Sequence, residues 1–168
     1  MDLSLAGKAA IIGGASQGIG FAIARVLAAE GARVAMVARR REPLDAAVGK
    51  IEGEACAIYA DIRKADDCAR IVASAVDRFG RVDIKITVNT ICPGRIATGR
   101  LDKGFGAGDG KPQIDELALT EMAKTIPIGR LGTPQEIAGP VALLASPWGA
   151  YITGSTFHVD GGRHAALA

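Results

Sequence analysis

Glycines between an apolar run and a helical pattern are the first residues here whose spacing indicates chemistry. The segment GGASQGIG occupies residues 13–20. Backbone amides at a helix N-terminus carry partial positive charge, and glycines allow a pyrophosphate to approach them closely. Glycines also make ordinary tight turns, but the strand–turn–helix context favours phosphate binding. The predicted contacts are Gly14, Ser16, Gln17, Gly18, Ile19 and Gly20.

Basic residues at the end of the second predicted strand indicate which dinucleotide would bind. An acid at this place would accept hydrogen bonds from the ribose 2′-hydroxyl and favour NAD. This chain has Ala38 there, followed by Arg39 and Arg40. A guanidinium can clamp a 2′-phosphate with two hydrogen bonds, whereas a carboxylate would repel it. The alternative is that both arginines are solvated loop residues, and the pattern favours NADP(H) over NAD(H).

The elements that must position these residues alternate along the chain. Apolar runs over residues 8–12, 33–38 and 55–60 predict buried parallel strands, and helical patterns follow each of them. Further on, residues 114–125 are helical in pattern, Thr133 opens a capping box before a helix to about Ala145, and residues 155–159 predict a last strand. Such alternation implies parallel pairing through right-handed crossovers. The predicted fold is therefore α/β, a Rossmann-like doubly wound sheet in one domain over residues 1–168.

The glycine spacing resembles that of the short-chain dehydrogenase/reductase family. The pattern is G-x-x-x-G-x-G at Gly14, Gly18 and Gly20, and the first position, commonly Thr in the family, is Gly13. Gln17 stands where NADP-preferring relatives often place a base, which weakens the cofactor assignment. The family's activity implies NAD(P)-dependent interconversion of an alcohol and a carbonyl.

Three further segments carry the same resemblance. ADIR places Asp61 and Ile62 where the family binds adenine. VNTICPGRIAT resembles the strand and Pro-Gly turn at the nicotinamide end, which implies Pro93, Gly94, Ile96 and Thr98 as lining residues. GRLGTPQEIAGPVALLASP and YITGSTFHVDGG are similar to the C-terminal helix and last strand, a subunit-pairing surface in the family. The resemblance therefore implies a homo-oligomer.

The family's proton donor is missing. Its tyrosine phenol titrates near 10 and needs a neighbouring cation, supplied by a lysine four residues later on the same helix. Here Tyr59 is followed at that spacing by Arg63 but lies in a predicted strand, and Tyr151 is followed by Ser155. We therefore predict no catalytic residue in this chain.

The missing tyrosine belongs to a longer missing segment. FGRVDI resembles the start of the family's fourth strand, and KITVNTICPG, which follows directly, resembles the sixth. The junction falls near Ile84 and Lys85, and two strand–helix units are absent, roughly 60 residues or more at about 30 per unit. Either the deletion is real, or the sequence lacks residues that the working protein has. An intact mass well above 17.2 kDa would show that the working protein has residues that this sequence lacks.

A deletion of this kind has an architectural consequence. Losing inner strands exposes backbone donors and acceptors in the core, at a cost for each buried group. We expect the stretch 81–92 to close the gap as one strand, paired with the first strand and the last, in a sheet of five strands. Val82 and Ile84 alternate with Asp83 and Lys85, so one face of that strand should be apolar and the other polar.

Composition excludes several other classes of function. A net charge of +2 without an aromatic-interleaved basic stretch argues against nucleic acid. Three cysteines without C-x-x-C spacing, and His158 and His164 without ligand spacing, predict no metal site. No apolar run reaches the roughly 18 residues of a membrane helix, and we expect a cytoplasmic protein.

The leading hypothesis is a family member that binds NADP(H) without catalysis, acting on a small-molecule substrate only if a full-length form exists. The alternative is a non-catalytic partner of a full-length subunit.

Overall fold

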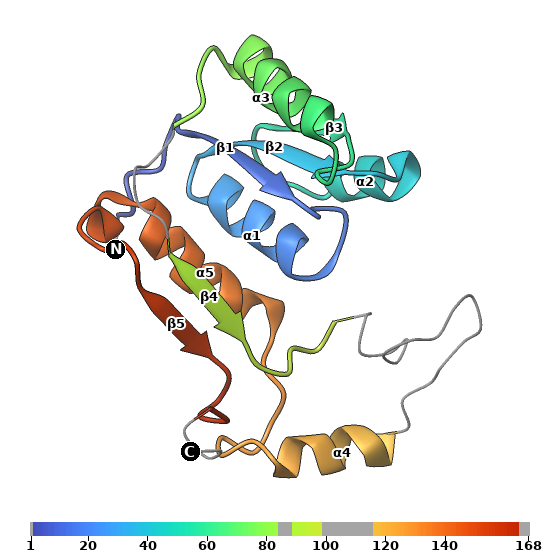
Figure 1. The fold of residues 1–168 in the computed structure, drawn as a ribbon, viewed down its shortest axis with the longest axis vertical. Helices are drawn as coiled ribbons and strands as arrows, with labels where there is room; N and C mark the ends of the chain where they lie inside the picture. Colours follow the sequence, from blue (N-terminus) through green and yellow to red (C-terminus); the bar gives the residue numbers. More distant parts are fainter. Residues whose placement is uncertain (1, 84–88, 99–115, 165–168) are drawn as a thin grey trace.

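The N-terminal half forms a three-stranded parallel sheet. In a computed structural model, which describes residues 2–83, 89–98 and 116–164, the strand order is β1-β2-β3. The elements are β1 (Ala9–Gly13), α1 (Gly18–Ala29), β2 (Arg33–Ala38), α2 (Arg41–Val48), β3 (Ala55–Tyr59) and α3 (Ala65–Phe79). Helices that alternate with parallel strands confirm the predicted α/β fold of the doubly wound type (Figure 1).

Two apolar layers hold this sheet. Leu27 of α1, Leu44 of α2 and Ala142 of the C-terminal half pack with Met36 on one face. On the other face Ile71, Ala75 and Phe79 of α3 meet Ala35, Val37 and Ile58. The spacing of the α3 residues at i, i+4 and i+8 explains why this helix lies on the sheet along one stripe. β2 is buried on both faces, as a run of apolar residues predicts.

The C-terminal half supplies a second, smaller sheet. Its elements are β4 (Thr90–Pro93), α4 (Glu116–Lys124), α5 (Pro134–Ala145), the 3₁₀ helix η1 (Pro147–Gly149) and β5 (Thr156–Val159). β4 pairs with β5 in parallel, from Thr90 opposite Thr156 to Pro93 opposite Val159. The predicted capping box is confirmed, because the hydroxyl of Thr133 accepts from the amide of Glu136 and the Glu136 carboxylate accepts from the amide of Thr133. α5 packs against α1 and so attaches this half to the first sheet (Figure 1).

The prediction of one five-stranded sheet is wrong for the described residues. Five strands are described, but they form sheets of three and two. The predicted pairing with the last strand is confirmed, because β4 pairs with β5. The predicted pairing with the first strand is limited, among the described residues, to the hydrogen bond from the Asp83 amide to the Ala9 carbonyl. Residues 84–88, the centre of the predicted single strand, and the exact junction lie outside the described residues.

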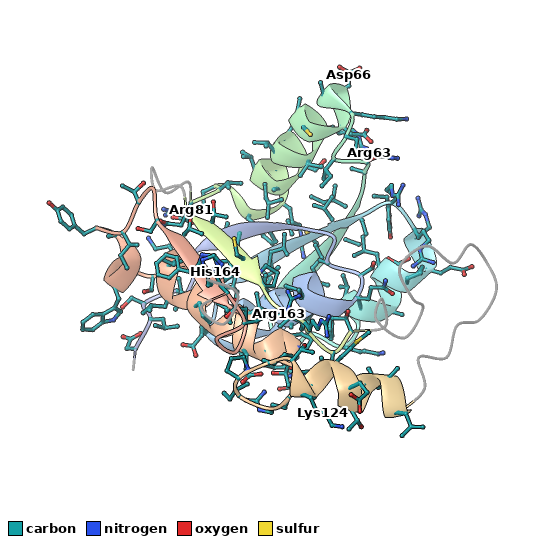
Figure 2. All side chains as sticks on the ribbon, turned by 60° about the horizontal axis from the view of Figure 1, so that its bottom comes forward. Arg63, Asp66, Arg81, Lys124, Arg163 and His164 are labelled. Carbon is teal, nitrogen blue, oxygen red and sulfur yellow. The ribbon has the colours of Figure 1, made fainter. Side chains whose placement is uncertain are left out.

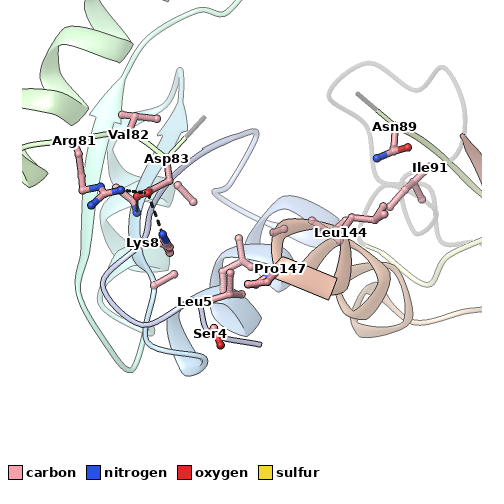
Figure 3. A pocket seen from close by; sticks show the side chains of 16 residues that line it. Ser4, Leu5, Lys8, Arg81, Val82, Asp83, Asn89, Ile91, Leu144 and Pro147 are labelled. Carbon is pink, nitrogen blue, oxygen red and sulfur yellow. Dashed lines mark hydrogen bonds and ion pairs between the residues drawn. The ribbon is translucent and has the colours of Figure 1, made fainter. Parts of the chain in front are cut away.

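A cavity of about 770 Å³ lies between the two halves. Its walls include Ala9 and Ala10 of β1, Asn89 and Ile91 beside and within β4, and Leu144 of α5 (Figure 3). Ala10, on the β1 side of the cavity, is half-buried, whereas β2 is buried over four consecutive residues. The opening therefore lies along the β1 edge of the first sheet.

Asp83 hydrogen-bonds to the backbone of Ala9, at the start of the β1 edge. Its amide donates to the carbonyl of Ala9 at 3.1 Å, and its carboxylate accepts from the amide of Ala9 at 2.8 Å. Lys8 lies 3.6 Å from Oδ1 of this carboxylate, and Arg81 pairs with the same oxygen (Figure 3). Burial raises the pKa of Asp83, but the Ala9 amide and the two cations outweigh burial and lower that pKa below its usual value. Among the described residues β1 has a partner strand only in β2, and Asp83 provides hydrogen bonds to Ala9 on its other side.

Asp83→Asn should lower the free energy of unfolding, by an amount that depends on pH. A carboxyl whose folded pKa is depressed stabilises the fold above its unfolded pKa near 4, and this contribution disappears as pH falls through the folded pKa. Urea unfolding of both proteins should therefore give a clear difference at about pH 7 and a smaller one at about pH 3. A difference that grows toward acid pH would contradict this role.

Among the described helices, none is long and apolar enough to cross a membrane.

Candidate dinucleotide-binding site

The glycine turn joins β1 to α1 at the carboxyl end of the sheet. Gly14 and Gly18 have φ values of +68° and +60°, a region that side chains other than glycine rarely adopt. Gln17 is the N-cap residue of α1 in an extended conformation, and the amide of Ala15 donates to the carbonyl of Val37 at 3.2 Å. The turn is therefore held against β2 and leads directly to the helix N-terminus, a site suited to an anion.

Gly20 is required for a different reason. A Cβ at this position would lie 2.5 Å from the carbonyl oxygen of Gly14 and 2.8 Å from its carbon. The first turn of α1 therefore packs directly on the backbone of the glycine turn. Only glycine permits this approach, which sets the distance between the turn and the helix N-terminus.

Gly20→Ala should lower the free energy of unfolding by about 1–3 kcal/mol, because an added methyl group in a tight contact must displace backbone. The matched control is Gly49→Ala. Gly49 has an ordinary φ of −62°, and a Cβ added there would lie 3.6 Å from its nearest neighbour, the carbonyl oxygen of Asp45. Urea unfolding should show a change of about 0.5 kcal/mol or less for the control. Equal effects of the two substitutions would disprove the close-packing argument.

A pocket of about 500 Å³ opens beside the turn. It brings together seven predicted residues from the ends of three strands: Gly14, Ser16, Gln17, Arg39, Arg40, Asp61 and Ile62. Val37, Ala38, Ala60 and Arg63 complete the lining. In open α/β sheets, ligands bind outside the carboxyl ends of the strands, and this pocket lies there. Gly18, Ile19 and Gly20 do not line it, since they form the first turn of α1.

The basic side of this pocket contains two arginines without an ion pair among the described residues. Arg39 and Arg40 are exposed, and they follow β2 directly. The third arginine of the triplet is engaged differently, since the Arg41 guanidinium lies 4.2 Å from the centre of the Tyr59 ring. Arg39 and Arg40 are thus the members of the triplet that remain available for an anion in the pocket.

Asp61, predicted to contact adenine, is held by Arg63. The Nε of Arg63 donates to Oδ1 of Asp61 at 2.9 Å, and its Nη2 donates to Oδ2 at 2.6 Å. The side chain of Asp61 is 16% exposed and that of Arg63 is 73% exposed. The hydrogen bonds from the side chain and amide of Arg63 lower the pKa of Asp61 far below its ordinary value. Asp61 is therefore a carboxylate throughout the range in which the protein would function.

The four residues predicted at the nicotinamide end are less closely grouped. Pro93 and Gly94 continue the pairing with β5, and a Cβ on Gly94 would lie 2.5 Å from the Cα of Asp160. Ile96 is buried and lines a separate pocket of about 270 Å³. Thr98 lies next to Gly18, since a Cβ there would be 3.6 Å from the Thr98 Cγ2. The structure thus places Thr98 against the glycine turn, while Ile96 faces another cavity.

Neither tyrosine has the environment of a proton donor. Tyr59 lies at the end of β3, as predicted, and its hydroxyl donates to the Asp45 carboxylate. That hydrogen bond raises the pKa of Tyr59, which is opposite to what a phenol acting near neutrality requires. Arg63, four residues later, pairs with Asp61 instead. Tyr151 is fully exposed to solvent beyond η1.

Sequence reasoning missed Arg63 as a lining residue. The signal was present, because a base two residues after an acid at a strand end can fold back on it in a turn. Arg63 also donates its backbone amide to the Asp61 carboxylate at 3.2 Å, as such a turn requires. In Figure 2 Arg63 and Asp66 lie at the same end of α3, where the chain passes from β3 into that helix.

A parallel sheet with a glycine turn at a helix N-terminus and a pocket beyond its strand ends defines the Rossmann class. Two family profiles match the chain and narrow the class. The profile described as "short chain dehydrogenase" matches residues 8–85. The profile described as "Enoyl-(Acyl carrier protein) reductase" matches residues 84–164. The chain belongs to the short-chain dehydrogenase/reductase family. The two matches meet at residues 84 and 85.

Individual relatives agree with this assignment. The short-chain reductase protein NovJ of Streptomyces niveus is 27% identical over 256 residues, which include 92% of this chain and 93% of NovJ. Because this chain has only 168 residues, that alignment passes over a long part of NovJ without a counterpart here. The 3-oxoacyl-[acyl-carrier-protein] reductase FabG of Vibrio cholerae is 44% identical over 79 residues, 47% of this chain and 28% of FabG.

Solved structures are similar over almost the whole chain. A dehydrogenase/reductase from Sinorhizobium meliloti has a TM-score of 0.80 and 25% identity, with 96% of this chain and 97% of that chain covered. A short-chain type dehydrogenase/reductase from Mycobacterium marinum, at 21% identity, has a TM-score of 0.81 and supports the fold.

Proposed function

We propose that this chain binds NADP(H) in the pocket beside the glycine turn. The observation that carries the proposal is the end of β2: Ala38 takes the place of an acid, and Arg39 and Arg40 line the pocket without an ion pair among the described residues. A 2′-phosphate there would meet two cations, whereas a carboxylate would have repelled it.

The residues present fit the rest of a dinucleotide. Gly14 has open space where a side chain would stand, so a pyrophosphate could reach the amides at the start of α1. Asp61 and Ile62 would face the adenine, and Thr98, next to Gly18, would lie toward the nicotinamide. When bound, the cofactor supplies hydride chemistry. The chain's own residues bind and orient it.

We further propose that the chain is internally shortened and does not reduce carbonyl groups. Three observations support this: the family matches meet at residues 84 and 85, NovJ has a long part without a counterpart, and a cavity of about 770 Å³ borders β1 between the two halves. Neither tyrosine is followed by a lysine at the family's spacing, and the hydrogen bond to Asp45 raises the pKa of Tyr59 although Arg41 lies over its ring. A full-length form, if one exists, would be an NADP-dependent alcohol/carbonyl oxidoreductase.

Titration of NADPH and NADH into the purified protein by isothermal titration calorimetry tests the binding proposal. We expect binding of both, with NADPH tighter by at least about tenfold, the effect of one charge-assisted hydrogen bond. Intact mass, measured on the same sample, shows whether the working protein has more than 17.2 kDa. Binding of neither cofactor would contradict the proposal.

A second function, as an oligomerisation partner, is favoured by one surface. Leu143, Trp148 and Tyr151, on α5, η1 and just beyond, are exposed by 38%, 64% and 102%. Exposed large apolar side chains that cluster mark interaction sites. The occupant would be the same surface of a second copy or of a full-length subunit. Sedimentation of the chain with and without Trp148→Ser would test this proposal, since the substitution should shift the protein toward monomer.

A further inference from the structure

We propose that Arg63 occupies the carboxylate of Asp61 in the free protein and competes with adenine for it, which makes Arg63 a residue that limits the affinity of the site for adenine-containing cofactors. The inference rests on the proposed function. It goes further, because it assigns a role to a residue outside the glycine turn and the arginine pair at the end of β2.

Three N–H donors of Arg63 hold both oxygens of the Asp61 carboxylate, with the single Nε–H shared between them. A carboxylate offers about four lone-pair sites. Oδ1 accepts from the amide of Arg63 at 3.2 Å and from its Nε at 2.9 Å, and Oδ2 accepts from Nε at 3.2 Å and from Nη2 at 2.6 Å. The donors of one residue therefore occupy both oxygens of the carboxylate.

An adenine amino group is also a hydrogen-bond donor. Because Arg63 bonds to both oxygens of Asp61, an amino group that binds this carboxylate competes with Arg63 and displaces or weakens at least one of its hydrogen bonds. Both residues line the pocket, and the Arg63 side chain is 73% exposed, which gives it room to move away. The cost of release applies to every ligand that carries adenine, with or without a 2′-phosphate.

Substitution of Arg63 should tighten cofactor binding, which is the opposite of what the loss of a simple contact would do. Arg63→Gln should tighten binding of NADPH and NADH alike, by about twofold to fivefold, the range expected for an exposed ion pair. A residue that merely contacts the cofactor would lose affinity on substitution. A clamp for the 2′-phosphate would lose affinity for NADPH alone.

Lys124→Gln is the matched control. Lys124 pairs with Glu121 at 2.6 Å on α4, and its side chain is 65% exposed, so it is also an exposed ion pair. It does not line the pocket, and its substitution should leave both affinities unchanged. Isothermal titration calorimetry of wild type, Arg63→Gln and Lys124→Gln with each cofactor, at low and high salt, gives the comparison. The advantage of Arg63→Gln should shrink at high salt, because salt weakens the pair in the wild type.

A second measurement needs no cofactor. Nuclear magnetic resonance titration should find the pKa of Asp61 far below its ordinary value in the wild type and closer to that value in Arg63→Gln. Unchanged or weaker binding by Arg63→Gln, with wild-type binding intact, overturns the inference and leaves the proposed function standing. If neither protein binds either cofactor, the proposed function itself fails, and the inference fails with it.

Discussion

Arg39→Ala should weaken NADPH binding by about 1–3 kcal/mol, the range for hydrogen bonds to charged groups, and barely affect NADH. Arg39 follows β2 directly and lines the pocket beside the glycine turn. Its guanidinium would pair with the 2′-phosphate that NADPH has and NADH lacks. At 1.4 kcal/mol for each factor of ten, the expected loss is roughly fivefold to 150-fold.

Arg41→Ala is the control for charge. It removes the same charge two residues away, but the Arg41 guanidinium lies over the Tyr59 ring and Arg41 does not line the pocket. Its substitution should change NADPH affinity far less than Arg39→Ala, and any effect should decrease with added salt. Calorimetric titration of the three proteins with both cofactors measures this directly. Equal losses of NADPH and NADH affinity in Arg39→Ala would disprove the assignment of the 2′-phosphate.

The purified chain should show no measurable turnover of carbonyl substrates with NADPH. General acid–base catalysis contributes typically 10²–10⁴-fold to a rate, and we propose that this chain lacks the phenol that supplies it in the family. Tyr59 donates to Asp45, which raises its pKa, and Tyr151 is fully exposed without a lysine at the family's spacing. The assay follows NADPH absorbance with a panel of ketones and aldehydes.

Tyr59→Phe and Tyr151→Phe separate the possible explanations of any residual rate. A rate that persists in the double variant would show that another acid serves. A rate abolished by one substitution alone would show that this tyrosine is catalytic and that our interpretation of its surroundings is wrong. NADPH binding, measured in parallel, should be the same in both variants as in the wild type, because neither tyrosine lines the pocket.

Local patterns in the sequence were sufficient for the first half of the fold. Apolar runs bounded by glycine predicted β1, β2 and β3, because a strand covered on both faces must be apolar throughout. The capping box at Thr133 and Glu136 predicted where α5 begins, since its two hydrogen bonds lie within one turn of chain. The glycine turn and the two arginines after β2 were predicted for the same reason, as each depends on residues adjacent in sequence.

Tertiary structure alone decided how the two halves meet. From the alternation of Val82 and Asp83 with their neighbours we expected one strand between the first strand and the last. One partner was predicted correctly, because β4 pairs with β5, but these two strands form a sheet separate from β1. Strand pairing depends on distant elements, which local alternation does not specify. Interactions within a turn or a cap, such as that of Arg63 with Asp61, can be predicted from neighbouring residues, whereas the edge of a sheet depends on which distant elements the fold brings near.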